Sequence, residues 1–275
     1  MQLPRTRAIV PSLELLDEVG STNAELVARA SAGARAGGTP LEHAPLKHFT
    51  VLATTNQTTG RGRLGRTWVA PPGTALAVSV LLTPPGATLE RLGWVPLMAG
   101  LAMCRAVREL LPTEAAVGLK WPNDVLVGER KVSGVLAEVV PGAAEPTSAA
   151  IVVGAGLNLS MTEQELPVPT ATSLALEGAV EADLLDRALA TYLAELRTLI
   201  DGFVRNGFDA DLGVRAAVLA ACTTIGSAVR VERPDGEIVG RAIDIDGAGR
   251  LVVETTGGIV VCAAGDVIHL RPVAG

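Results

Sequence analysis

The sequence predicts an α+β protein that ends in a small β-barrel. Two observations predict this class: apolar runs of strand length alternate with helical stretches as far as Ala221, and the tail holds only short strands separated by tight turns. The change of pattern places a domain boundary near Ala221, between a larger domain over 1–221 and a smaller one over 222–275. A chain of 275 residues, 48% hydrophobic and 19% charged, is long enough for both.

The elements of the first domain follow from hydrophobic periodicity and its interruptions. Thr22 and Glu25 form a capping-box pattern, and Pro96 predicts a helix start near Trp94, because proline is tolerated in a first turn. Apolar residues three and four apart predict an amphipathic helix over 182–203. In chain order we expect a helix over 19–33, strands over 48–55 and 74–83, a helix over 94–111, strands over 117–121, 124–127, 131–140 and 149–159, and helices over 182–203 and 209–221.

The tail from Ser227 to Arg271 contains five runs of strand length with glycine-containing turns between them. The runs are AVRVERP, EIVGRAIDID, RLVVETT, GIVVCA and VIHL. Short strands joined by tight turns favour a small barrel.

Composition argues against several classes of protein. The apolar stretch 92–104 is shorter than the roughly 20 residues of a membrane span, and the N-terminus lacks a signal-peptide pattern, so we expect a cytoplasmic protein. A net charge of -6 argues against general affinity for nucleic acid. The cysteines lack disulfide or zinc spacing, and we expect free thiols at Cys104, Cys222 and Cys262.

The strongest local signal is the run GRGRLGRTW over 60–68. Its glycines let the backbone approach a ligand, and Arg61, Arg63 and Arg66 supply forked donors for phosphate or carboxylate oxygens. The run therefore fits a ligand with several anionic oxygens, although its spacing is neither that of a Walker A loop nor that of a Rossmann fingerprint. A solvated flexible loop and an RNA-binding Arg-Gly segment are the alternatives.

Two further signals contain two of the three lysines in the chain. In KWPND, over 120–124, proline stiffens a turn between strands, and Asn123 and Asp124 project from a strand end, where a carboxylate could hold Mg²⁺ or an amine. A plain hairpin corner is the alternative. In KVSG, over 131–134, Lys131 alternates with apolar residues and would need an anionic partner if it faced inward. A strand lysine facing solvent is the alternative.

In this order the motifs resemble the catalytic domain of biotin protein ligases. The run over 60–68 looks like that family's GRGRxGRxW loop, KWPND followed by KxxG looks like its second signature, and GAGLN over 154–158 matches its GxGxN strand. The resemblance covers essentially the whole chain. It implies a mixed-sheet biotin/lipoate ligase domain related to class II aminoacyl-tRNA synthetases, followed by an SH3-like β-barrel.

The resemblance also implies a two-step reaction. Biotin and ATP form biotinyl-5′-AMP and pyrophosphate with Mg²⁺, and a lysine of a biotin carboxyl carrier domain of an acyl-CoA or pyruvate carboxylase then attacks the mixed anhydride. A lipoate–protein ligase or lipoyl transferase of the same fold is the nearest alternative, and a non-enzymatic anion-binding regulator is the alternative from another class. We expect a monomer or weak homodimer.

The resemblance assigns roles residue by residue. Lys131, Arg61 and Arg63 would offset the repulsion between carboxylate and α-phosphate. The expected biotin-binding residues are Ser21, Thr22, Asn23, Gln57, Gly60, Arg61, Gly62, Arg63 and Lys131. The expected ATP- or adenylate-binding residues are Arg63, Arg66, Trp68, Asn123, Asp124 and Asn158. Asp124 is also the expected metal ligand. For Trp68, the alternative is a tryptophan of the hydrophobic core.

Two departures from the family pattern stand out. Leu64 replaces a further basic residue found in some members. About 20 residues precede Ser21, which is too few for a DNA-binding helix-turn-helix, so we expect no DNA partner and no repressor activity.

Overall fold

The computed structural model describes residues 2–10, 12–35, 46–141, 149–179, 183–233, 236–263 and 265–270. Within them, seven strands form a central sheet. In their order across the sheet they are β1 (Leu13–Leu16), β2 (Val51–Thr54), β5 (Ala75–Leu82), β9 (Ile151–Asn158), β8 (Arg130–Val139), β7 (Asp124–Val127) and β6 (Val117–Lys120). Strands β1 and β2 are parallel and the other neighbours are antiparallel, so the expected mixed sheet is confirmed.

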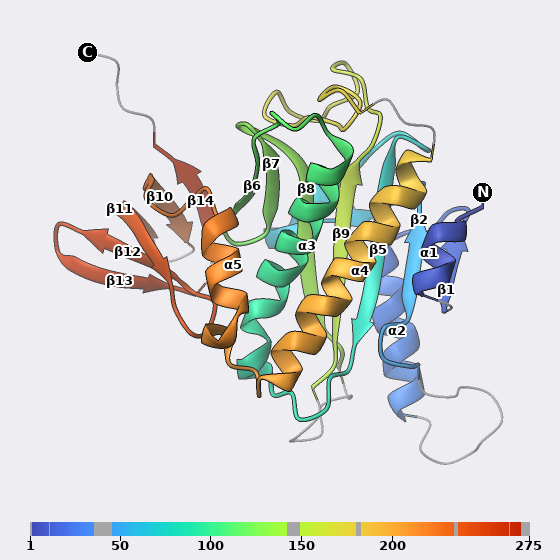
Figure 1. Cartoon of the computed structure of the whole chain (residues 1–275), viewed down its shortest axis with the longest axis horizontal. Helices are drawn as coiled ribbons and strands as arrows, with labels where there is room; N and C mark the ends of the chain where they lie inside the picture. The colour runs from blue at the N-terminus through green and yellow to red at the C-terminus, as the bar shows by residue number, and fades with distance from the viewer. Residues whose placement is uncertain are drawn as a thin grey trace.

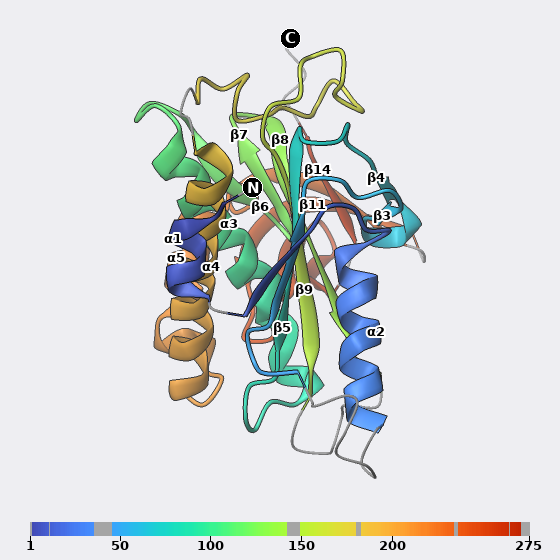
Figure 2. The same cartoon turned by 90° about the vertical axis from the view of Figure 1, so that its right-hand side faces the viewer.

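Helices cover both faces of this sheet, as Figures 1 and 2 show. One face carries α1 (Pro4–Ile9), α3 (Val95–Leu110), α4 (Leu184–Arg205) and α5 (Val214–Ala221). The other face carries α2 (Thr22–Arg35) and the small hairpin of β3 (Gly60–Arg61) and β4 (Thr67–Trp68). Short 3₁₀ turns are η1 (Arg63–Gly65), η2 (Leu89–Trp94) and η3 (Ala210–Leu212). The hairpin that contains most of the 60–68 run therefore lies on the less crowded face.

Most of the predicted helices and strands are present, but α1 and β1 were not predicted, and three further details differ. Helix α2 begins at Thr22, and Ser21 is its cap, because the Ala24 amide donates to Ser21 Oγ at 3.4 Å. The predicted capping box at Thr22 and Glu25 is wrong, since the Thr22 hydroxyl instead bonds Gln57 Oε1 at 3.1 Å. The predicted helix over 209–221 is divided at Gly213, whose φ is 139°, and the expected loop over 57–68 contains the β3–β4 hairpin.

The tail forms a separate antiparallel sheet, consistent with the predicted SH3-like barrel. In their order across it, the strands are β13 (Gly258–Cys262), β12 (Leu251–Thr255), β11 (Gly236–Ile245), β10 (Ala228–Arg233) and β14 (Asp266–His269). Alternate residues such as Val229, Val231, Leu251 and Val253 are buried. This period of two is the pattern of strands with one face on a core.

Two tryptophans of the first domain hold the turn between β11 and β12. The buried indole of Trp94 donates to Gly247 O at 2.8 Å, and that of Trp121 donates to Gly249 O at 3.1 Å. A Cβ at Gly93 would lie 2.4 Å from Ala248 O, so the two backbones touch directly. The barrel is thus packed onto the first domain, and the predicted boundary near Ala221 stays a prediction.

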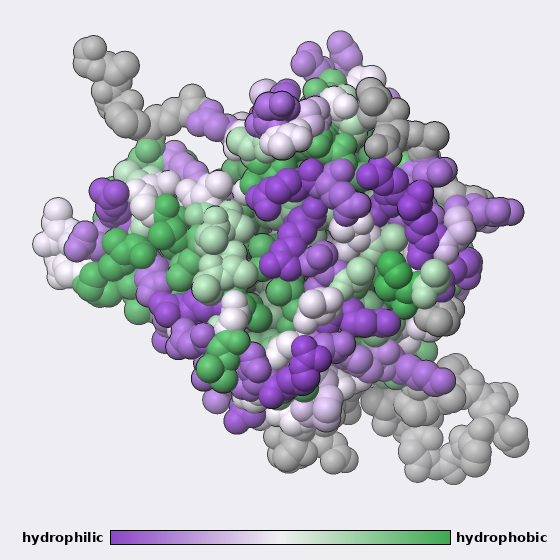
Figure 3. All heavy atoms as spheres, in the orientation of Figure 1, coloured by the Kyte–Doolittle hydropathy of each residue, from purple (hydrophilic) through white to green (hydrophobic). Residues whose placement is uncertain are grey.

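The surface mixes hydrophilic and hydrophobic residues, as Figure 3 shows for one face. Exposed apolar side chains of the barrel strands include Val239, Ile243, Ile259 and Val261. Among the described helices, none is long and apolar enough to cross a membrane.

Trp94→Phe should lower the free energy of unfolding by about 2 kcal/mol, because the indole donor to the barrel turn is lost and its pocket is underfilled. Denaturant unfolding measures the change. Tyr192→Phe is the matched control: the Tyr192 hydroxyl is buried without a hydrogen-bond partner among the described residues, so its removal should be neutral or stabilising. Equal losses in both variants would contradict the role of the Trp94 hydrogen bond.

Candidate functional site

The predicted site residues converge on one cavity of about 490 Å³, here called the inner cavity. It lies between the start of α2, the β3–β4 hairpin and the sheet strands β5, β9, β8 and β7. The predicted residues that line it are Ser21, Thr22, Asn23, Gln57, Arg61, Gly62, Arg63, Arg66, Trp68, Asn123, Asp124, Lys131 and Asn158. Gly60 lies outside this lining, and a Cβ there would come within 2.3 Å of Trp68 O.

Three glycines leave the sheet backbone bare at parts of the floor of the inner cavity. A Cβ at Gly154 would lie 2.1 Å from Asn23 Oδ1, and one at Gly156 would lie 2.8 Å from the ring of Trp68. A Cβ at Gly134 would lie 2.9 Å from Lys131 Nζ. Each glycine therefore gives room to one predicted site residue.

A network of neutral polar groups fills the end of the cavity at the start of α2. Gln57 Oε1 accepts from the Thr22 amide at 2.8 Å, which leaves its amide nitrogen free to donate elsewhere. The buried Ser79 hydroxyl lies 2.6 Å from Asn23 Oδ1 and 2.8 Å from Thr22 Oγ1. The Thr22 amide thus orients the side-chain amide of Gln57, and the Ser79 hydroxyl orients that of Asn23. Fixed neutral donors and acceptors suit a neutral ligand group that itself donates and accepts.

The three hairpin arginines contact three different elements. Arg61 pairs with Glu138 on β8 at 3.4 Å, Arg63 donates to Asn123 Oδ1 at 3.0 Å, and Arg66 pairs with Asp266 of the barrel strand β14. Burial lowers the pKa of the Arg63 guanidinium, and the nearby carboxylates of Asp266 and Asp124 oppose that effect. The hairpin is thus tied across the cavity by its own cations.

Lys131 and Asp124 form an ion pair of 2.6 Å on the floor beside the arginines. Lys131 thus has an anionic partner, and its side chain is 43% exposed rather than buried. Lys120, the first residue of KWPND, lies opposite Asp124 in the β6–β7 register but outside the cavity lining. Burial lowers the Lys120 pKa, and Asp124 acts in the opposite direction.

The remaining predicted residues help to shape the wall. Asn158 donates to Thr172 O at 2.8 Å and so holds the following segment against the cavity. Trp68 lies on Gly156 and is half-buried, so it is a cavity residue rather than a core tryptophan.

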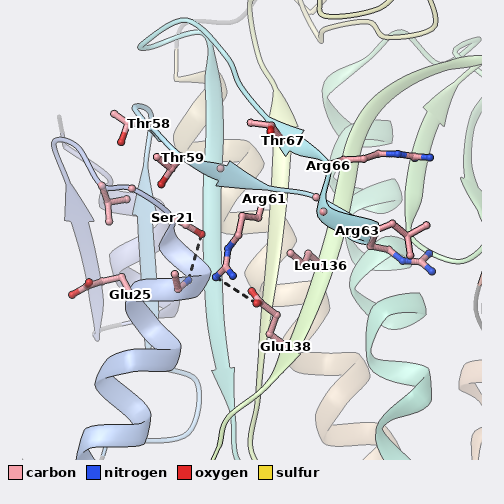
Figure 4. A pocket seen from close by; sticks show the side chains of 17 residues that line it. Ser21, Glu25, Thr58, Thr59, Arg61, Arg63, Arg66, Thr67, Leu136 and Glu138 are labelled. Atoms are coloured by element: carbon pink, nitrogen blue, oxygen red, sulfur yellow. Dashed lines mark hydrogen bonds and ion pairs between the residues drawn. The ribbon is translucent and has the colours of Figure 1, made fainter.

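A second, larger hollow of about 1040 Å³, here called the outer cavity, adjoins the inner cavity and shares the hairpin and the start of α2 with it. Figure 4 shows its residues, with Arg61 extending from β3 toward Glu138 on β8, while Ser21 lies at the start of α2. Arg61 lines both cavities, whereas Glu138 lines only the outer one among those described.

Sequence reasoning missed three residues of this site: Ser79, Glu138 and Asp266. Ser79 is the one polar residue in the otherwise apolar strand β5, which was an available signal. Glu138 follows the KxxG motif by four residues on the same strand. Asp266 lies 200 residues from Arg66, its partner, and no local pattern could connect them.

The described residues contain no group of three or more His, Cys, Asp or Glu side chains placed to hold a metal ion. Among the described residues, Asp124 and Asp266 are the two carboxylates that line the inner cavity. Magnesium needs only one or two carboxylates when phosphate oxygens and water complete its shell. The side chains therefore fit a magnesium ion that arrives with a phosphate ligand.

Comparisons with known proteins agree with this geometry. Residues 38–158 match the biotin/lipoate A/B protein ligase family, and residues 224–270 match the biotin protein ligase C terminal domain. The chain belongs to this ligase family. It is 41% identical to the biotin–[acetyl-CoA-carboxylase] ligase of Mycobacterium tuberculosis over 94% of this chain and 89% of that protein.

Solved structures show the same fold. The biotin protein ligase of Aquifex aeolicus in complex with biotin and ATP has a TM-score of 0.67 and 28% identity, over 94% of this chain and 99% of that one. The Leishmania major enzyme in complex with biotinyl-5-AMP has a TM-score of 0.57 and 25% identity, over 95% of this chain and 99% of that one. The predicted fold class and the resemblance are both confirmed.

Gly154→Ala should abolish ligand binding in the inner cavity, because the added methyl group would displace the Asn23 amide. Calorimetry with biotin, the ligand of the Aquifex aeolicus structure, measures the loss, which we expect to exceed roughly 100-fold. Gly257→Ala in the barrel is the control, since a Cβ there meets nothing closer than 3.8 Å. An unchanged biotin affinity in Gly154→Ala would contradict the inference that the space above Gly154 is needed for ligand binding.

Proposed function

We propose that this chain is an ATP-dependent biotin protein ligase. In the first step, a carboxylate oxygen of biotin attacks the α-phosphorus of ATP, the bond to the bridging oxygen breaks, and pyrophosphate leaves. In the second step, a lysine amine of the biotin carboxyl carrier domain of an acyl-CoA carboxylase attacks the acyl carbon of biotinyl-5′-AMP, and AMP leaves as an amide forms.

The observation that carries this proposal is the division of the inner cavity into a neutral end and a cationic end. Ser21, Asn23 and Gln57 offer fixed neutral groups that fit a cyclic urea, which has one acceptor and two N–H donors. Arg63, Arg66 and Lys131 line the same cavity with the carboxylates Asp124 and Asp266, and Arg61 lies between the two groups, paired with Glu138 beside Asn23. This excess of positive charge fits the carboxylate and phosphate of an adenylate.

The cationic end would promote the first step electrostatically. Two anions must approach each other, and guanidinium and ammonium groups already aimed at the cavity reduce their repulsion. Lys131 can keep its contact with Asp124 while donating to a phosphate oxygen, because an ammonium group has three donors. The hairpin and Trp68 would shield the adenylate from water.

We propose Asp124 as the protein ligand of a magnesium ion bound with ATP. The ion would supply positive charge at the phosphates. Asp266, which pairs with Arg66, is the other carboxylate within the described cavity wall. Calorimetric titration of magnesium with and without ATP, in the wild type and in Asp124→Asn, tests this assignment.

A lipoate ligase of the same fold is the second candidate. The presence of the barrel and the polar network around Asn23 favour biotin, because the lipoyl ring has no N–H or C=O group for that network to bind. The proposed carrier partner, the monomeric or weakly dimeric state and the cytoplasmic location stay predictions.

The deciding experiment is mass spectrometry of a carrier domain after incubation with the protein, ATP, Mg²⁺ and either biotin or lipoate. We expect modification by biotin alone. Modification by lipoate alone would replace the proposal with the second candidate, and no modification with either acid would refute it.

Lys131→Ala should fold normally but lose most adenylate formation. Removing a cation that faces the reacting anions should raise the barrier by about 2–4 kcal/mol, so the rate of biotin-dependent ATP–pyrophosphate exchange should fall roughly 30- to 1000-fold. Lys47→Ala is the control, because Lys47 is exposed and outside the cavity. A native exchange rate in Lys131→Ala would show that Lys131 does not contribute to adenylate formation.

We also propose that the chain does not act as a DNA-binding repressor. Its net charge is -6, and the tail is acidic as well, with Arg230, Arg233, Arg241, Arg250 and Arg271 against Glu232, Asp235, Glu237, Asp244, Asp246, Glu254 and Asp266. A gel-shift titration on the promoter of its own gene, with biotin and ATP present, should show no specific band. A sequence-specific shift at submicromolar protein would contradict this.

A further inference from the structure

Glu138 lies where the two cavities meet, and no motif recognised in the sequence includes it. Its carboxylate accepts from Asn23 Nδ2 at 2.8 Å through one oxygen and pairs with Arg61 at 3.4 Å through the other. Figure 4 shows the pair with Arg61 between β3 and β8. Since Glu138 is absent from the inner-cavity lining, its carboxylate reaches that cavity through these two neighbours.

The Asn23 side chain has one favourable orientation in these surroundings. Its amide nitrogen donates to Glu138 Oε2 and to Leu136 O at 3.1 Å, and its oxygen faces the Ser79 hydroxyl. A reversed amide would place its oxygen against a carboxylate and a carbonyl, neither of which can donate. The negative charge of Glu138 makes this reversal the more costly.

We propose that Glu138 is a positioning residue for ligand selection: it holds the Asn23 oxygen over the floor glycine Gly154 and anchors β3 through Arg61. The inner cavity then presents a fixed acceptor, which selects a ligand whose ring donates an N–H at that point. This inference rests on the proposed function, because it names how the same site recognises the cyclic urea of biotin.

The test compares biotin affinity, by calorimetry, in the wild type, Glu138→Ala and Glu138→Gln. Glu138→Ala should bind biotin at least tenfold more weakly, because Asn23 loses a charged acceptor. Glu138→Gln should recover most of that loss, because its amide oxygen can still accept from Asn23. Glu14→Ala is the matched control, because Glu14 is a strand carboxylate that pairs with Arg29 at 2.6 Å and lines neither cavity. This variant should bind biotin with native affinity.

A double-mutant cycle with Asn23→Ala separates positioning from a general structural effect. If Glu138 acts through Asn23, Glu138→Ala should cause a smaller fold loss in the Asn23→Ala background than in the wild type. Equal losses in both backgrounds, native affinity in Glu138→Ala, or no recovery in Glu138→Gln would each overturn the inference. When Asn23→Ala binds too weakly to measure, the alanine and glutamine variants decide. Absence of biotin binding by the wild type would instead refute the proposed function.

Discussion

The arrangement of the site depends on a steric constraint: two neighbouring strands of the central sheet carry glycines at three positions in the floor of the inner cavity. Gly134 of β8 pairs with Gly156 of β9, and Gly154 lies two residues before Gly156 on the same strand. The side chains that would act on a ligand lie flat against these bare backbones instead of standing on them. Any larger residue would fill the space that those side chains and the ligand share.

The charges of the site are distributed over parts of the chain that are far apart in sequence. The hairpin cations meet Glu138 on β8, Asn123 at a turn and Asp266 of the barrel, so that both domains hold one hairpin. The indole hydrogen bonds at the domain contact keep the barrel close enough for Asp266 to take part. The packing of the barrel on the first domain therefore also determines which charges lie around the cavity.

Local patterns predicted most of the fold and the motif part of the site. Hydrophobic period and turn residues are properties of adjacent positions, so most helices and strands after residue 19 and the location of the 60–68 run could be inferred from sequence alone, whereas α1, β1 and the β3–β4 hairpin were not. The misplaced helix cap shows the limit: Ser21 and Thr22 are both good caps, and only the position of Gln57 across the fold decides that Thr22 bonds elsewhere.

Residues whose role depends on register or on distant contacts could not be inferred in this way. In the sequence, Glu138 and Ser79 look like ordinary strand residues. Their roles become visible only when the fold brings Glu138 on β8, and Ser79 on β5, within hydrogen-bond distance of Asn23 at the start of α2. Asp266 is one of several acidic residues in the tail. Each became recognisable only when tertiary structure brought its partner within hydrogen-bond reach.

The positions of the three tryptophans give the molecule an optical property. Trp94 and Trp121 are buried at the contact with the barrel, whereas Trp68 is half-buried over the cavity floor. Indole emission responds to the polarity around the ring, so the three emitters divide into two that report on the docking of the barrel and one that reports on the cavity. Intrinsic fluorescence can therefore follow occupancy of the site and separation of the domains in the same sample, without an added label.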